Sequence, residues 1–428
     1  MTAAISLIVL LVVLGSSIAV AAGMGLVGLI LNQVYSPMPL TRMLGELTWS
    51  TTNNFILTAI PFYIMFGEIL LRSGIAERMY NALIQWLSWL PGGLMHSNIG
   101  SCALFGSVSG SSVATAATIG VVAMGEIDKH KYNERLFLGT LAAGGTLGIL
   151  IPPSINMIIY GVMTDTSVPK LYLAGFIPGF ILTLLFSLTV LIACLWRPHW
   201  GGERISTSWE ARIRTLPDLL PPLALLMIVI GAIFLGIATA TESAAVGIIG
   251  ALAITAWRRR LTLTMLRDVC EATVRTTAMV VAILVGAFFL NVVIQTIGLT
   301  QQLGRLITAY QLTPVQVLTA VIVLYLVLGT FMEELSMMIS TIPITTPLIL
   351  QAGYDPVWFG ILIVLLIQTA MVTPPFGINI FVIHGIRGRG TLSDVERGSA
   401  PFVIALLLMI GLICVFPEIV MWLPRIVG

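Results

Sequence analysis

Two proline pairs, Pro152-Pro153 and Pro374-Pro375, interrupt otherwise apolar stretches of this 428-residue chain. A proline has no amide hydrogen and clashes with the carbonyl four residues earlier, so a pair within a helix leaves backbone oxygens without a helical donor. The oxygens freed in this way are those of Gly148 and Ile149 at the first break, and of Ala370 and Met371 at the second. Hard cations such as sodium take ligands of this kind, and two breaks in matching positions favour a binding site over a pair of simple kinks.

Each break is preceded by a segment that is polar and rich in small residues. The sequence GSVSGSSVATAATIGVVAMG (106–125) is too short and too polar to cross and recross a bilayer, so it predicts a re-entrant hairpin whose tip lies against protein or water. The sequence GTFMEELSMMISTIPITTPLIL (329–350) predicts a second hairpin. Small and hydroxylated residues also let helices pack closely, and for any single serine the two interpretations have equal weight. The candidate residues of the two hairpins are Ser107, Ser109, Gly110, Ser111, Ser112, Thr330, Glu333, Ser336, Ser340, Thr341, Thr345 and Thr346.

The composition shows what kind of protein holds these segments. Hydrophobic residues make up 57% of the chain and charged residues only 9%, against about a quarter charged in soluble domains. The first apolar stretch is too long for a signal peptide and is expected to be retained. The chain is therefore predicted to be an all-α, polytopic membrane protein. Stretches long enough to cross a bilayer lie near 4–31, 52–71, 171–195, 217–237, 276–296, 314–330 and 401–424.

The charge and cysteine content argue against other classes. A net charge of +2 without a basic face argues against nucleic-acid binding. The cysteines have neither metal-ligand spacing nor the density of a disulfide framework, so they are expected to be packing residues. They are Cys102, Cys194, Cys270 and Cys414.

A shift of about 223 residues aligns the two halves of the chain with each other. Gly106 then matches Gly329, the proline pairs match, and INMIIYG (155–161) matches INIFVIHG (378–385). Repeats with interrupted helices in matching positions indicate a transport site between them near mid-membrane. The predicted organisation is a first repeat over 1–200 with a hairpin at 106–125 and a broken helix at 135–163, a polar loop over 201–216, and a second repeat over 217–428 with a hairpin at 329–350 and a broken helix at 357–386.

The orientation of the two halves stays open at this point. Four basic clusters all favour the cytoplasmic side, and they do not all fit an inverted arrangement if 217–237 and 240–256 both cross the membrane. The segment 240–256 is the one that could fail to cross completely. The clusters lie at 129–135, 197–214, 258–267 and 387–397.

Ionisable residues inside apolar stretches are functional candidates. Glu68 has Arg72 one turn later, and the pair is better explained as a structural salt bridge. Glu242, Glu333 and Glu334 have no evident local partner. Each could bind a coupling cation, relay a proton, or lie buried in protein or at the headgroups.

These motifs resemble those of a known family, the large membrane subunit of the tripartite ATP-independent periplasmic (TRAP) transporters. The resemblance covers essentially the whole chain in order. It is carried by IPFYIMFGEILLRSG, SGSSVATAATIG, AAGGTLGILIPPSINMIIYG followed by AGFIPG, TATESAAVG, and GYDPVWFGI leading into TPPFGINIF. The resemblance implies an elevator-type carrier of the ion-transporter superfamily, with two inverted repeats and sodium coupling. It further implies a small four-helix membrane subunit, expected here as a separate chain, a periplasmic substrate-binding protein, and a place in the inner membrane of a bacterium or archaeon.

The resemblance also assigns roles to residues. The first sodium site falls on Ser107, Gly148, Ile151 and Pro153, and the second on Gly329, Ala370, Thr373 and Phe376. The family usually has glycine at position 370 and aspartate at position 333, but the alanine still offers its carbonyl. No cofactor is expected beyond the coupling sodium ions, and the substrate is expected to be a small organic acid or zwitterion. The expected substrate-binding residues are Ser109, Gly110, Ser111, Ser112, Ser154, Asn156, Ser336 and Asn379.

Three alternatives remain at this stage. A stand-alone sodium- or proton-coupled dicarboxylate or citrate symporter of the same superfamily would share these motifs. An intramembrane hydrolase would use Ser111 or Ser112 with His96, but no second polar residue is placed to orient that histidine. A channel would show flux that neither saturates nor needs sodium.

Overall fold

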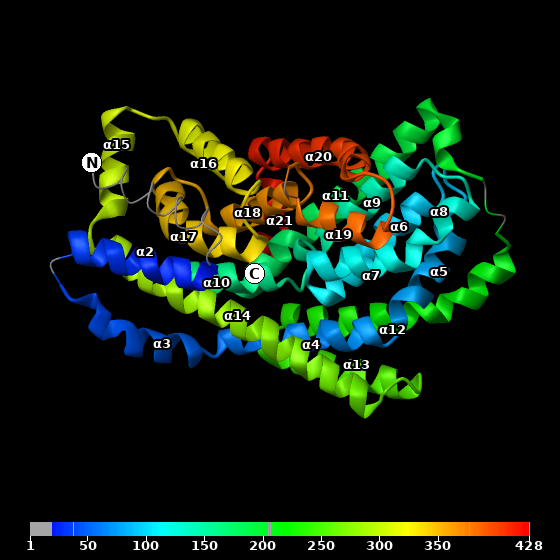
Figure 1. Cartoon of the computed structure of the whole chain (residues 1–428), viewed down its shortest axis with the longest axis horizontal. Coiled ribbons are helices and arrows are strands. Elements are labelled where there is room, and N and C mark those ends of the chain that lie inside the picture. The colour runs from blue at the N-terminus through cyan, green and yellow to red at the C-terminus, as the bar shows by residue number, and fades with distance from the viewer. Residues whose placement is uncertain (1–18, 37, 204, 206, 376, 428) are drawn as a thin grey trace.

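The described part of the computed structural model is built from helices connected by turns (Figure 1). It comprises residues 19–427 apart from 37, 204, 206 and 376, and it contains no strand. The prediction of an all-α protein is confirmed over this part of the chain. Residues 4–18, most of the first predicted span (4–31), lie outside the described residues.

One layer of the molecule consists of long helices from both halves of the chain, seen along the lower side of Figure 1. Within it, α14 packs against α2 and α4, while α13 packs against α4 and α12. We call this layer the scaffold layer. Its helices are α2 (Val20–Tyr35), α3 (Leu44–Thr52), α4 (Ala59–Arg72), α12 (Trp209–Phe234), α13 (Ala240–Trp257) and α14 (Leu263–Thr296), with the short η1 (Leu40–Met43) and η2 (Ile56–Thr58).

A second layer, which we call the hairpin layer, contains the predicted hairpins and breaks. The helices α5 (Ile75–Leu87) and α15 (Leu299–Ala309) connect the layers, since each contacts helices of both. The hairpin layer consists of α6 (Leu94–Ser109), α7 (Ser112–Met124), α8 (Glu126–Lys129), α9 (Glu134–Thr146), η3 (Leu147–Ile149), α10 (Ile155–Thr164), α11 (Val168–Trp196), η4 (Pro198–Gly201), α16 (Pro314–Leu328), α17 (Glu334–Gln351), α18 (Pro356–Met371), α19 (Ile378–Arg387), α20 (Leu392–Val415) and α21 (Glu418–Val427).

Each hairpin is a pair of helices joined at a short tip. The tip between α6 and α7 is Gly110-Ser111, where Gly110 has a φ of +63° and Ser111 caps α7. Only glycine adopts such a φ without strain. The tip between α16 and α17 spans 329–333, and Glu333 caps α17. Each predicted range, 106–125 or 329–350, therefore contains the tip and the second helix of its hairpin. The first helices of the two hairpins, α6 and α16, begin before these ranges.

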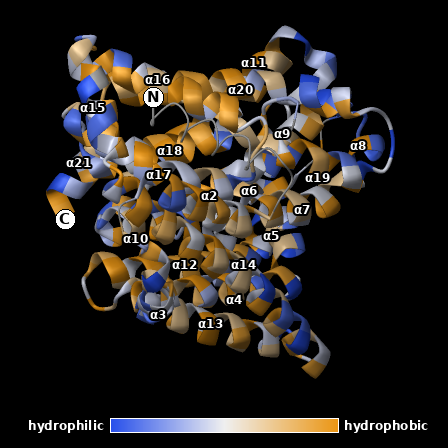
Figure 2. Cartoon of the chain, turned by 60° about the vertical axis from the view of Figure 1, so that its left-hand side comes forward, coloured by the Kyte–Doolittle hydropathy of each residue, from blue (hydrophilic) through white to orange (hydrophobic). Residues whose placement is uncertain are grey.

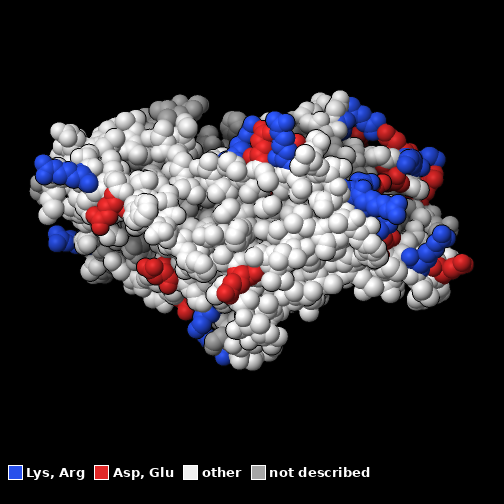
Figure 3. Space-filling model, turned by 90° about the horizontal axis from the view of Figure 1, so that it is seen from below, with Lys and Arg blue, Asp and Glu red and all other residues white. Residues whose placement is uncertain are grey.

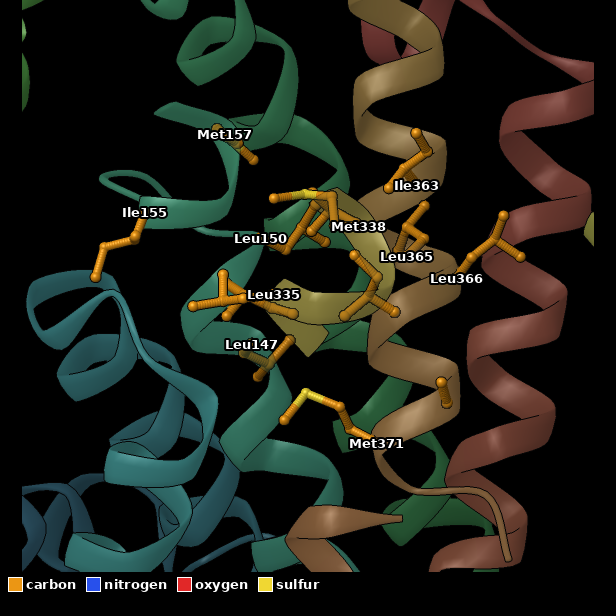
Figure 4. Packing of buried hydrophobic residues seen from close by; sticks show 14 of the residues in the cluster. Leu147, Leu150, Ile155, Met157, Leu335, Met338, Ile363, Leu365, Leu366 and Met371 are labelled. Carbon is orange, nitrogen blue, oxygen red and sulfur yellow. The ribbon is translucent and has the colours of Figure 1, made fainter. Parts of the chain in front are cut away.

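Each proline pair separates two helices. The first pair lies between η3, which continues α9, and α10, and the second lies between α18 and α19. In Figure 4, Leu335 and Met338 of α17 lie between Leu147 and Leu150 of the first break and Leu365 of α18. The second hairpin is thus packed into the core beside the first break.

The surface is that of a membrane protein. Five helices of the described chain, α11, α12, α13, α14 and α20, are long and apolar enough to cross a bilayer, and the bent pair 40–52 and 56–72 would be a sixth. Hydrophobic residues cover most helices in Figure 2, and charged residues occupy only a few clusters of the face in Figure 3. The helix α13 has 18 residues and meets the same test, so its length permits 240–256 to cross.

The predicted Glu68–Arg72 salt bridge is present. The expectation that all four cysteines are packing residues is wrong for Cys270, which is exposed, because it lies in the polar first part of α14, beside Glu271.

A network of ion pairs ties α9 to the α19–α20 corner. The Arg387 side chain is buried and donates to Glu134 at 2.8 Å and to Asp394 at 3.2 Å. Arg389 binds Asp128 at 2.6 Å, and this hydrogen bond lowers the pKa of the Asp128 carboxyl. The network joins segments from both halves of the hairpin layer.

The closest helix pair in the hairpin layer is α9 with α20. A Cβ atom on Gly139 would lie 2.0 Å from the Gly398 carbonyl oxygen, and one on Gly398 would lie 1.8 Å from the Arg135 carbonyl oxygen. Small residues permit this approach, as they do between other membrane helices.

We expect Gly398→Ala to destabilise the protein by about 1–3 kcal/mol, because the added methyl group overlaps the α9 backbone. Thermal unfolding of the purified protein in detergent measures this loss. Gly411→Ala is the matched control, since it lies on the same helix and its added Cβ meets nothing within 4 Å. Equal unfolding midpoints for the two variants would contradict the described packing.

Candidate functional site

The first break lies directly against the first hairpin. A Cβ atom on Gly106 would lie 2.6 Å from the Gly148 Cα, so the two backbones touch. A Cβ atom on Gly148 would lie 3.1 Å from the Thr115 Oγ1 and 3.2 Å from the Ser111 carbonyl oxygen. Only glycine at both positions lets oxygen atoms of the hairpin approach the backbone of the break.

The carbonyls freed at the first break have different surroundings. The Ile149 carbonyl accepts a hydrogen bond from the Ser154 hydroxyl at 2.6 Å. The Gly148 carbonyl has no helical donor, because prolines occupy the positions four and five residues later. The Pro153 carbonyl oxygen faces the hairpin tip, 3.3 Å from where a Cβ on Gly110 would lie.

Two other residues of the predicted first sodium site have local hydrogen bonds. The Ser107 hydroxyl donates to the Leu104 carbonyl at 2.8 Å, and the Ile151 amide donates to the Leu147 carbonyl at 3.0 Å. The hydroxyl oxygen of Ser107 and the carbonyl of Ile151 keep their acceptor capacity.

The second break has a similar contact with the second hairpin. A Cβ atom on Gly329 would lie 2.1 Å from the Ala370 Cβ and 3.0 Å from the Tyr325 carbonyl oxygen. The freed Ala370 carbonyl accepts a 3.3 Å hydrogen bond from the Thr373 amide, and the Thr373 hydroxyl donates to the Thr369 carbonyl at 2.6 Å. Phe376, the remaining residue of the predicted second sodium site, lies outside the described residues.

A cavity of about 290 Å³ lies between the two layers, where both hairpin tips meet the start of α10. Ser109, Gly110 and Ser111 line it from the first hairpin, and Glu333 and Glu334 from the second. Its volume is near the lower end of the range of small-molecule sites. The cavity therefore suits a small solute held between the hairpins.

The structure brings four of the eight predicted substrate-binding residues to this cavity, namely Ser109, Gly110, Ser111 and Asn156. The other four bond to protein instead. Asn379 donates to the Ser112 hydroxyl at 2.8 Å and to the Ala142 carbonyl at 2.9 Å. Ser154 binds the Ile149 carbonyl, and both the amide and the hydroxyl of Ser336 donate to Glu333 at 3.0 Å.

The remaining hydroxyl candidates of the second hairpin do not line this cavity. Three of them, Ser340, Thr341 and Thr345, donate to carbonyls one turn earlier in α17. Thr330 donates to Val327 at 2.7 Å, and Thr346 is buried. The arrangement of these side chains agrees with the interpretation that small and hydroxylated residues let helices pack closely.

The scaffold layer supplies further cavity residues, of which the sequence indicated only Glu68, as half of a salt bridge. Gly67 and Glu68 of α4 and Thr276 and Met279 of α14 line the side opposite the hairpins. A Cβ atom on Gly67 would lie 2.9 Å from the Ser109 carbonyl oxygen, so α4 touches the hairpin tip directly. No local pattern marks Gly67, Thr276 or Met279, because their place at the cavity comes from contacts between distant segments.

Two predicted ionisable candidates have structural roles. The idea that Glu242 lacks a local partner is wrong, because it forms a capping box with Thr239 at the start of α13 and is exposed. His96 bonds to Ser187 at 2.6 Å and to the Pro91 carbonyl, so the expectation that no second polar residue is placed to orient this histidine is wrong. It lies about 20 Å along α6 from Ser111, which removes the basis for a serine–histidine hydrolase.

The two breaks are also linked by a polar contact in the core. The Gln368 side-chain amide donates to the Thr146 carbonyl at 2.6 Å, and the two residues are 222 positions apart. Thr146 ends α9 and Gln368 is in the last turn of α18. The ends of both interrupted helices therefore meet.

Apolar spanning helices around two broken helices and two hairpin tips define a helical membrane transporter. The structure has the same overall fold as the YdaH transporter of Alcanivorax borkumensis, with a TM-score of 0.61 and 15% identity, over 97% of this chain and 98% of that one.

The chain belongs to the family described as "Tripartite ATP-independent periplasmic transporter, DctM component", whose profile matches residues 5–419. It is 30% identical over 407 residues to the C4-dicarboxylate TRAP transporter large permease protein DctM of Pseudomonas aeruginosa, covering 95% of this chain and 94% of that protein. It is 31% identical over 386 residues to the sialic acid TRAP transporter large permease protein SiaM of Vibrio cholerae, covering 90% and 88%. The predicted family is confirmed, and these relatives are permeases rather than enzymes.

We expect Asn379→Ala to destabilise the fold by about 1–3 kcal/mol, because it leaves the Ser112 hydroxyl and the Ala142 carbonyl without their buried donor. Asn291→Ala is the control, since the side chain of Asn291 accepts an exposed bond from Gln295 at 3.2 Å. Thermal unfolding in detergent compares the two. Unchanged stability of Asn379→Ala would show that this amide is free for another role.

Proposed function

We propose that this chain is the permease subunit that carries a small organic solute, an organic acid or a zwitterion, across the inner membrane together with sodium ions. The observation that carries the proposal is the pair of contacts between hairpin and break, Gly106 with Gly148 and Gly329 with Ala370. At each contact, a backbone carbonyl that lacks its normal helical amide donor, that of Gly148 or of Ala370, belongs to a residue packed against one of the two hairpins.

We assign the sodium sites to these contacts. The first uses Ser107, Gly148, Ile151 and Pro153, and the second uses Gly329, Ala370 and Thr373, with Phe376 as the remaining predicted ligand. Sodium bound there would replace the missing amide donors and hold each hairpin against its break. Sodium is transported in this scheme, so it is cargo rather than a resident cofactor.

The proposed repeats are two copies of one unit related by a two-fold axis. Reciprocal packing supports this arrangement, since α2 packs against α14 while its counterpart α13 packs against α4. In the same way, α7 packs against α19 while α17 packs against α10. When two copies are related by a two-fold axis, a contact from element A of the first copy to element B of the second is matched by a contact from B of the first to A of the second. An inverted orientation of the two copies in the membrane is part of the proposal.

The proposed mechanism is an elevator movement of the hairpin layer past the scaffold layer. The cavity supports it, because one side is lined by hairpin residues and the other by α4 and α14. A sliding hairpin layer would carry the solute while changing its scaffold contacts. The connecting helices α5 and α15 would follow that movement.

The family suggests the partners. A small membrane subunit, as a separate chain, and a periplasmic substrate-binding protein that delivers the solute complete the proposed transporter. The names of two relatives cite C4-dicarboxylates and sialic acid, so solute choice varies within the family. A stand-alone symporter is the alternative function, and it would need neither partner.

Reconstitution of the full complex in liposomes tests the function. We expect an inward sodium gradient to drive saturable uptake, and we expect uptake to require the binding protein. Uptake that persists without the binding protein would favour the stand-alone symporter, and flux independent of sodium would contradict the proposal.

A pair of threonine variants tests the second sodium site. We expect Thr373→Ala to raise the sodium concentration for half-maximal uptake several-fold, and Thr330→Ala to change it little. The variants are matched, since each hydroxyl donates to a carbonyl of the preceding turn, at 2.6 Å for Thr373 and 2.7 Å for Thr330. Identical, unchanged sodium dependence in both would refute this site.

A further inference from the structure

Two buried polar groups in the cavity have no hydrogen-bond partner among the described residues. They are the side-chain nitrogen of Asn156 and one carboxylate oxygen of Glu334. The residues are 1% and 8% exposed, and both line the cavity. Buried polar groups are normally satisfied, so an unpaired donor and an unpaired carboxylate in one cavity indicate a ligand that pairs with both.

The part of the lining around Asn156 favours negative charge. Asn156 is in the first turn of α10, and Ser111, which caps α7, lines the same region. Helix N-termini present free amides and partial positive charge, which favour anions. The Ser154 side chain does not cap α10, because its hydroxyl donates to Ile149 instead. The first amides of α10 therefore remain available to a carboxylate.

The part of the lining around Glu334 is acidic and favours positive charge. Glu333 already accepts two hydrogen bonds from Ser336, whereas Glu334 adds a second carboxylate with an unpaired oxygen. Glu68, the third acidic residue of the lining, is paired with Arg72. No lysine or arginine occurs among the described lining residues. A buried carboxylate that keeps its charge is costly unless a cation reaches it; otherwise it takes up a proton.

Comparison of the proposed repeats shows how this polarity arises. Ser111 caps α7 and Glu333 caps α17. Aligning the two caps, at a shift of 222 residues as between the proline pairs, makes Ser112 correspond to Glu334. In one of the two equivalent pairs, Ser112 of the first half accepts a hydrogen bond from Asn379 of the second half. In the other pair the equivalent positions hold Glu334 of the second half and Asn156 of the first; both residues line the cavity, and each has an unpaired polar atom.

We infer that the cavity binds a zwitterionic solute, with its positively charged nitrogen at Glu334 and its carboxylate at Asn156 and the α10 N-terminus. This inference rests on the proposed transport function and names its substrate class. A dicarboxylate would place a second negative charge beside Glu333 and Glu334, without a basic residue to offset it. The site thus selects against the solute class named for the Pseudomonas aeruginosa relative.

Matched solute pairs test the charge requirement. Purified protein in sodium buffer is heated with one member of each of two pairs, β-alanine or succinate, and 4-aminobutyrate or glutarate. In each pair the second compound has a carboxylate where the first has an ammonium group. The trimethylammonium forms of both zwitterions are tested as well. We expect at least one zwitterion to raise the unfolding temperature, and each to exceed its dicarboxylate partner. A larger shift with a dicarboxylate, or no shift with any zwitterion, would overturn the inference.

Glu334→Gln then tests the residue. We expect it to weaken binding of the best zwitterion at least tenfold while changing sodium affinity less than twofold. Glu242→Gln is the control, an exposed cap of α13 for which we expect neither affinity to change. Asn156→Asp, which puts a negative charge at the carboxylate end, is expected to weaken binding similarly. Loss of sodium affinity larger than loss of zwitterion affinity in Glu334→Gln would mean that Glu334 serves the coupling ion, and would overturn the inference.

The two proposals fail in different ways. Sodium-driven uptake of a dicarboxylate would refute the zwitterion site and leave the transport function intact. Zwitterion binding that depends on Glu334, without sodium-driven uptake, would refute the transport function and leave the site intact.

Discussion

The structure depends on one constraint, which is that backbone carbonyls without donors must be satisfied inside a membrane protein. Each proline pair creates such oxygens, and leaving them in hydrocarbon costs several kcal/mol each. The fold covers both breaks with hairpins, and the approach is close enough to require glycine at Gly106 and Gly148. The hairpins, their small residues and the core position of the breaks all follow from this requirement.

The same constraint explains why the cavity lies between the layers. A hairpin that packs its helices against a break must turn its tip toward another surface, and here α4 and α14 provide it. Gly67 lets α4 reach the Ser109 backbone. The tips therefore contact protein on one side and the cavity on the other, which suits polar groups that cannot face lipid.

Local chemistry made part of this site predictable from sequence. The positions of the proline pairs identified the breaks, and the polar segments rich in small residues identified the hairpins that precede them. Partner choice between distant segments was not predictable, as Asn379 and Ser112 are 267 positions apart yet share a hydrogen bond. Whether Glu333 and Glu334 find hydrogen-bond partners also depends on where α17 begins. Glu333 is the cap and accepts from the amide of Ser336, whereas Glu334, the next residue, keeps one oxygen unpaired.

Duplication gives a site two equivalent halves, and a symmetric site has no reason to prefer a polar ligand in one orientation. In this chain the caps differ, with serines at the first hairpin and glutamates at the second. Asn379 and Ser112 bond to each other across the two halves, while the equivalent pair, Asn156 and Glu334, has unpaired polar atoms. The cavity between the layers therefore lies beside the pair whose hydrogen bond is missing, and the proposed ligand would take its place.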